Sequence, residues 1–140
     1  DMTTTAYEDV LGQMATIEAA IAGVGVAYER APEGLTVLPA FVNYPLRGES
    51  EYSAGEGVKD IRTLLTVCYV ARGDSQTGED KARPFIDLFE DAVYADPTLG
   101  GTVDTVITIR HSYGKVLWGL SEWFIGIRFE VDFKMRRIIP

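Results

Sequence analysis

Nucleophilic chemistry in this chain would depend on one histidine. Any serine–histidine or cysteine–histidine device would have to use His111, because the sequence contains no other imidazole. Ser112 is its neighbour in sequence, but adjacent residues on a strand point to opposite sides. Cys68 lies within an apolar run, which is typical of a buried and inert thiol. These residues favour a turn or surface role for His111 over a catalytic one.

Acid–base and metal chemistry would have to come from the carboxylates. The pairs Glu79–Asp80 and Glu90–Asp91 fall at the start and on the polar side of an expected helix, where acids are usually solvated. Asp74 with Glu79 and Asp80 does not match the spacing of an EF-hand loop, and one cysteine with one histidine cannot form a usual zinc site. The sequence therefore predicts no enzyme, no catalytic residues, no metal and no cofactor.

Composition predicts one domain over residues 1–140. Hydrophobic residues make up 46% and charged residues 24% of the chain, as in folded globular proteins. The net charge of −8 repels phosphate and argues against nucleic-acid binding over a broad face. No apolar run approaches the ~20 residues that span a bilayer, and no export signal is visible at the start. A single cysteine excludes an internal disulfide, which suits assembly in a reducing cytoplasm.

The first half of the sequence predicts one helix and two strands. Apolar residues at helical spacing over 5–22 predict the helix, with Glu18 among the residues on its exposed surface. Strands are expected at 26–29 and 38–45, and prolines around the second favour a sheet edge. Residues 46–59 have no apolar periodicity and predict a long polar loop, either a mobile hairpin tip or a segment that orders on a partner.

The second half predicts a further helix between strands. A central strand is expected at 61–71, where both faces are apolar, and a polar loop leads through a capping pattern at Thr77 and Asp80 to a helix that ends near Tyr94. Pro84 sits early in this helix and is a candidate for its first turn. Strands at 103–110 and 116–118 are expected to flank a turn at 111–115.

The final strand is the clearest element of the sequence. Large apolar residues occupy every odd position from Trp123 to Met135, and most residues between them are charged. This alternation predicts one buried and one wet face. At ~3.3 Å per residue the strand runs about 40 Å, roughly twice the usual length. Part of it must protrude, bend or pair with another chain.

The order of helix, strands, helix and strands predicts an α+β fold. We expect a mostly antiparallel mixed sheet of about five strands with two main helices packed on one face. The sequence contains no internal repeat and no low-complexity tract that would suggest another architecture.

Several local stretches follow one another in a recognisable order. None is a catalytic signature. They are Ile21–Gly25 ahead of Tyr28, Leu38–Val42, Leu64–Tyr69, the helix with Phe85, Ile86 and Phe89, and Phe129–Phe133. In this order and over nearly its full length, the chain resembles the tail-terminator (tail-completion, or minor tail) proteins of long-tailed bacteriophages of the siphophage type.

The resemblance implies a structural virion protein without catalytic residues. Such proteins form a hexameric ring that caps the tail tube, ends tail polymerisation and joins the tail to the head connector. The implied partners are other copies of the chain, the tail-tube protein and head–tail connector proteins, with DNA passing through the ring and no membrane contact. The implied location is the tail or the head–tail neck of the virion, after assembly in the host cytoplasm.

The interface residues are inferred from charge and from surplus surface. One group is expected on one side of the subunit, within 47–59, and a basic group on the other side, in the final strand, because opposite charges on neighbouring copies attract. The predicted interface residues are Arg47, Glu49, Glu51, Tyr52, Lys59, Arg128, Lys134, Arg136 and Arg137.

Three other functions compete with this prediction. Another neck, head–tail connector or tail-tube ring subunit would have similar features. A small α+β enzyme or ligand-binding domain would need a pocket with converging polar groups, for which His111 and neighbouring carboxylates are the candidates. A monomeric accessory domain could bind a partner by adding a strand to its sheet edge.

Overall fold

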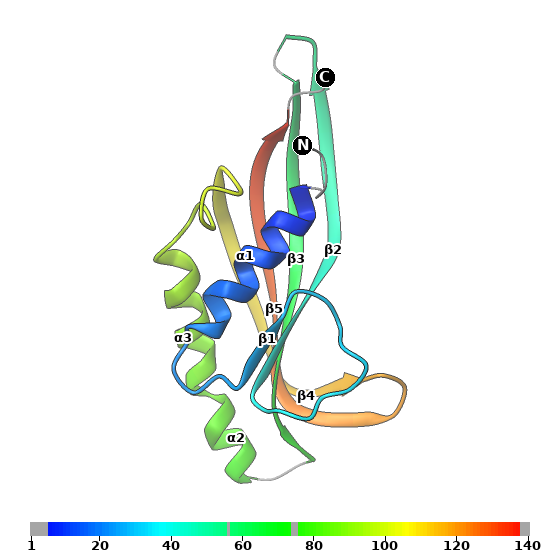
Figure 1. Ribbon diagram of the computed structural model, residues 1–140, viewed down its shortest axis with the longest axis vertical. Helices are drawn as coiled ribbons and strands as arrows, with labels where there is room; N and C mark the ends of the chain where they lie inside the picture. Colours follow the sequence, from blue (N-terminus) through cyan, green and yellow to red (C-terminus); the bar gives the residue numbers. More distant parts are fainter. Residues whose placement is uncertain (1–5, 56, 74–75, 138–140) are drawn as a thin grey trace.

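The described residues form three helices and five strands (Figure 1). The computed structural model describes residues 6–55, 57–73 and 76–137. The elements in chain order are α1 (Ala6–Ala19), β1 (Val26–Tyr28), β2 (Ala40–Ser53), β3 (Gly57–Arg72), α2 (Gln76–Ala82), α3 (Pro84–Tyr94), β4 (Thr105–Trp118) and β5 (Glu122–Arg137).

All five strands belong to one sheet with the order β1-β2-β3-β5-β4. Only β1 runs parallel to its neighbour, and the pairs β2–β3, β3–β5 and β4–β5 are antiparallel. The longer helices α1 and α3 lie on one face of this sheet (Figure 1). The predicted α+β class, the mixed sheet of about five strands and the two main helices on one face are therefore confirmed.

The main core lies between these helices and the sheet. Phe89 of α3 stacks on Phe129 of β5, with 4.1 Å between ring centroids, and also on Phe41 of β2 at 5.8 Å. Val10 and Met14 of α1 are fully buried in the same cluster. One side of the core is formed by apolar residues at helical spacing in α1 and α3. The other side is formed by the alternating apolar residues of the strands.

A second, smaller core occupies the opposite face at one end of the sheet. Tyr69 of β3 packs edge-on against Trp118 and Phe124, with ring centroids 5.4 and 5.3 Å away. A register shift between Tyr69 and Ala71 accompanies the curl of the β4–β5 end around this cluster (Figure 1). Leu35, from the segment between β1 and β2, is buried in the same cluster.

The predicted alternation in the final strand is correct from Ile125 to Met135, where every odd position is buried. It is wrong at Trp123, which is 51% exposed, while its neighbour Phe124 is fully buried. The reason is the second core, which draws Phe124 under the curled end of the sheet and turns Trp123 outward.

Residues 46–59 belong to a hairpin, as one of the two interpretations expected, but the prediction that they form a long polar loop is wrong. β2 continues to Ser53 and β3 already begins at Gly57, so this stretch is a paired hairpin. Its first strand is exposed from Leu46 to Tyr52, so no burial pattern marks it in the sequence. Backbone hydrogen bonds between strands form without buried side chains, which is why polarity did not prevent pairing.

Two further boundaries differ from the prediction. β4 is continuous through residues 111–115, where a turn was expected, and Gly114 there faces Gly126 of β5. The expected single helix that ends near Tyr94 is divided into α2 and α3, and α3 begins at Pro84, the candidate for its first turn. Proline fits the first turn of a helix but removes an N–H from a helix interior, so it marks this start.

Candidate interaction surface

The helical layer ends before the β2–β3 hairpin does. Tyr7, in the first turn of α1, donates its hydroxyl hydrogen bond to the carbonyl oxygen of Arg47 at 3.3 Å, and the carbonyl oxygen of Thr63 lies 3.5 Å away. The Arg62 guanidinium covers the Tyr7 ring, 4.4 Å from its centroid. Among the described residues, α1 therefore reaches only to this level, and the hairpin over 48–62 extends beyond it (Figure 1).

The sheet face opposite α1 and α3 is termed the open face here. Opposing residues in antiparallel strands project to the same side of a sheet. Glu51, Lys59 and Arg136 are opposed across β2, β3 and β5. Two further rows follow on this face, first Glu49, Ile61 and Lys134, then Arg47, Thr63 and Asp132.

This register corrects one feature of the predicted interface. The residues from 47–59 and the basic residues Lys134 and Arg136 were expected on opposite sides of the subunit, but they lie beside each other on the open face. The strand order explains the difference, because β3 carries Lys59 directly next to β5. Tyr52 opposes Val58 on the other face and is 68% exposed. Arg137 ends β5, and its side chain lies outside the described part of the structure.

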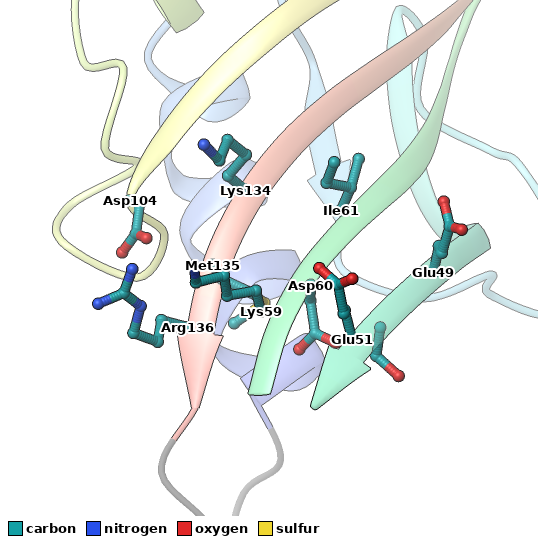
Figure 2. A pocket seen from close by; sticks show the side chains of 10 residues that line it. Glu49, Glu51, Lys59, Asp60, Ile61, Asp104, Lys134, Met135 and Arg136 are labelled. Atoms are coloured by element: carbon teal, nitrogen blue, oxygen red, sulfur yellow. The ribbon is translucent and has the colours of Figure 1, made fainter. Parts of the chain in front are cut away.

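A cavity of about 540 Å³ opens near the end of the hairpin (Figure 2). Figure 2 shows acidic residues from β2 and basic residues from β3 and β5 around it. Its charged and apolar lining includes Glu49, Glu51, Lys59, Lys134, Arg136, Ile61 and Asp104. A surface that carries both signs of charge suits a partner with both signs better than it suits a simple anion or cation.

A network of ion pairs and hydrogen bonds connects the strands in the middle of the open face. Arg110 of β4 donates two hydrogen bonds to Asp132 of β5, at 2.8 and 2.9 Å, and Thr63 of β3 donates another at 2.6 Å. Arg47 of β2 reaches across β3 to Glu130 at 2.8 Å. Side chains from four strands thus cross-link the sheet.

The network lowers the pKa values of its two carboxyl groups, Glu130 and Asp132. Hydrogen bonds from Arg110 chiefly lower the pKa of Asp132, and partial burial opposes this. Burial would raise the pKa of Glu130, but hydrogen bonds from Arg47 and Arg110 lower it overall. Both groups are therefore charged at neutral pH, and the network stays intact there.

An apolar hollow of about 210 Å³ lies at the other end of the open face, over the second core. It is lined by Tyr44, Leu65, Val67, Tyr69, Val116, Leu117 and Arg128. Arg128 is exposed, and no carboxylate of the described residues lies within ion-pair distance of it. The predicted interface residue Arg128 is thus separate from Lys134 and Arg136.

His111 and Ser112 point to opposite sides of β4, as the strand geometry requires. His111 Nδ1 lies 3.5 Å from Glu90 Oε2 of α3, on the helix side. Ser112 opposes Arg128 on the open face. Both contact a cavity of about 120 Å³ together with Arg110, Arg128 and Glu130. This arrangement gives His111 no hydrogen-bonded hydroxyl or thiol nucleophile among the described residues.

Glu18 was predicted on the surface of the first helix, and this prediction is wrong. The residue is fully buried where α1 approaches β2 and β3. Its Oε1 accepts a 2.7 Å hydrogen bond from Asn43, whose own oxygen accepts one from Thr66 at 2.6 Å. Glu18 Oε2 has no hydrogen-bond partner among the described residues. Burial raises the pKa of Glu18 well above its ordinary value, although Asn43 and Thr66 lower it in part.

Sequence reasoning missed several residues of the open face. Glu130 and Asp132 share the even phase of β5 with Arg128 and Lys134, so the period of two could have placed them there. Arg110 was missed because a turn was expected immediately after it. Asp104, which precedes β4, gave no signal because its place at the cavity depends on the strand order.

The described residues show neither a cluster placed to bind a metal nor a helix that could span a membrane. Within 6–55, 57–73 and 76–137, no cluster of three or more His, Cys, Asp or Glu side chains is placed to hold a metal ion. The helices of this described part are too short and too polar to cross a bilayer. A comparison with protein families and with curated proteins gives no match to this chain.

Proposed function

We propose that this chain is a structural virion protein of the tail-terminator class, whose copies form a ring that caps a tail tube. The observation that carries the proposal is the projecting β2–β3 hairpin, which leaves the helical layer at the level of Tyr7 and exposes charged side chains beyond it. Among residues 48–62 of the described structure, only Val58 and Asp60 are buried, so the rest of the hairpin surface is available for contacts between subunits.

Ring formation requires two unlike surfaces on one subunit. The open face offers one with both signs of charge, and the outer side of α1 and α3 offers a second. In the proposed ring, the tail-tube protein binds one end and head–tail connector proteins bind the other. The net charge of −8 suits a channel through which DNA passes without being held.

The first test is native mass spectrometry of the purified protein, alone and with the tail-tube protein of the same phage, with negative-stain images of the same samples. We expect a closed ring of about six copies, as the resemblance implies, or rings that cap short tubes. A protein that stays monomeric at high concentration and leaves tube length unchanged would rule out the proposal.

Shortening the hairpin tests the observation directly. Ser50 opposes Asp60, so residues 51–59 can be replaced by Asn-Gly, which favours a tight two-residue turn. We expect at least about a tenfold loss of ring or tube-cap assembly, because the removed strands carry much of the charged surface. Circular dichroism should show a folded monomer, because the main core is retained.

The control for this variant is Ala54→Asn. Ala54 is an exposed residue at the hairpin tip, and its substitution alters the tip while keeping both strands at full length. Its assembly should equal that of the original protein. Normal assembly of the shortened variant would show that the hairpin is not a subunit contact.

The outer edge of β2 supports a second candidate function, partner binding by strand addition. β1 pairs with β2 only at Ala40–Val42, and the remaining strands of the described sheet leave the outer edge of β2 uncovered from Tyr44 onward. An added strand would take up the free backbone groups of this edge. Binding of a strand-forming partner by a protein that never forms rings would favour this candidate.

A further inference from the structure

The outer side of α3 has an unusual combination of residues. Asp87, Leu88, Asp91 and Tyr94 recur at spacings of three and four, which places them on one side of the helix. Leu88 is 37% exposed and Tyr94 is 48% exposed, although both are large and apolar. We term these four residues the α3 stripe.

The two acids of the α3 stripe have no basic partner in the part of the chain that the structure describes. Asp87 and Asp91 are both exposed, and no Lys, Arg or His of the described residues forms an ion pair with either. The stripe thus presents two apolar side chains beside two uncompensated negative charges.

The hollow on the open face has the complementary character. Six of its seven lining residues are aliphatic or aromatic, and the seventh, Arg128, forms no ion pair with a described residue. The hollow has a volume of about 210 Å³, several times the ~30 Å³ that one water molecule occupies in the liquid. It is therefore large enough to hold a side chain. The hollow lies on the sheet face away from α3, so one subunit cannot fill its own hollow with its own stripe.

We propose that the α3 stripe of one copy docks in the hollow on the open face of the next copy, with Asp91 or Asp87 paired to Arg128. This contact rests on the proposed ring function and identifies two of its surfaces. Leu88 and Tyr94 insert against the apolar lining, and the aspartates neutralise Arg128 as both lose water. The contact joins unlike surfaces, so it propagates from copy to copy and closes only when the rotation between copies allows.

Charge reversal on each side tests the pairing. Asp91→Arg and Arg128→Glu should each weaken assembly by at least about tenfold when the variant is alone, because like charges then meet in every contact. Mixing the two variants at equal amounts should restore assembly. In the mixture, every contact can join an arginine on one side to a carboxylate on the other, provided that the two variants alternate. Native mass spectrometry should show both variants in equal numbers within the restored particle.

The control is Asp80→Arg, a reversal at an exposed acid of α2 outside the stripe. It should assemble as the original protein does. Thermal unfolding of all variants should stay within a few degrees of the original, because the changed residues are exposed.

Each other outcome of this experiment is decisive. If the original protein forms rings but the mixture is not restored, the pairing is wrong and the ring function stands. Rings formed normally by both single variants overturn the docking proposal in the same way. If the single variants form rings yet fail to cap tubes, the tube protein occupies this hollow instead of a second copy. Absence of any ring or cap from the original protein overturns both proposals.

Discussion

Substitution of Gly126 by alanine should prevent stable folding of this protein. A Cβ atom at this position of β5 would lie 2.1 Å from the carbonyl oxygen of Cys68 in β3, and 2.9 Å from a methyl group of Val116. The nearest atom belongs to the backbone of the central strand, so it cannot move aside without breaking the β3–β5 pairing. We expect the free energy of unfolding to fall by about 4 kcal/mol or more, a large part of the total for a small domain.

Urea denaturation followed by circular dichroism measures this effect. Gly34→Ala is the matched control, because a Cβ there meets no atom within 4 Å. We expect that control to change the free energy of unfolding by about 0.5 kcal/mol or less. A Gly126→Ala protein within about 1 kcal/mol of the original would contradict the close strand contact.

The substitution Glu18→Gln should change how stability depends on pH. Burial raises the pKa of Glu18 in the folded protein above its value of 4.5 in an unfolded chain. The folded state therefore holds this proton more tightly, so the stabilisation is complete below pH 4.5 and is lost as pH rises toward the folded pKa. Within that window, Glu18 should lower the free energy of unfolding by about 1.4 kcal/mol per pH unit.

The Glu18→Gln variant should lose this slope, because an amide side chain does not ionise. The measurement is the difference in free energy of unfolding between the two proteins from about pH 4 to about pH 9. Taking the difference removes the contribution of Asp132 and Glu130, whose lowered pKa values act in the opposite direction. Glu33→Gln, which makes the same chemical change at an exposed position, is the control. A constant difference for Glu18→Gln would show that Glu18 titrates normally.

The features that could be predicted from the sequence are those in which a buried face requires apolar residues at regular spacing. Large apolar residues occupy the odd positions from Ile125 to Met135 because this face of β5 packs against the core under α1 and α3. The β2 arm of the hairpin was missed because its side chains are exposed from Leu46 to Tyr52 while its backbone is paired, and backbone pairing leaves no apolar pattern. Glu18 was misplaced because helical spacing does not reveal what packs above a helix end.

The interaction surface was harder to predict than the fold. Lys59 and Arg136 were both predicted as interface residues, but nothing in their local sequence shows that they oppose each other. Their proximity follows from the placement of β5 between β3 and β4, a pairing between segments far apart in the chain. The hollow near Arg128 depends in the same way on the curl of the sheet around Tyr69 and Phe124.

The position of β5 between β3 and β4 also determines the order in which the sheet is completed. A ribosome makes β5 after all the other described strands, yet β3 and β4 each need it as a neighbour. Until β5 emerges, the nascent chain holds the β2–β3 hairpin with one uncovered inner edge and β4 without its partner strand. Such long-range pairing makes folding slow and leaves strand edges open to other chains. The chain is therefore most exposed to disordered association during its synthesis, before β5 completes the sheet.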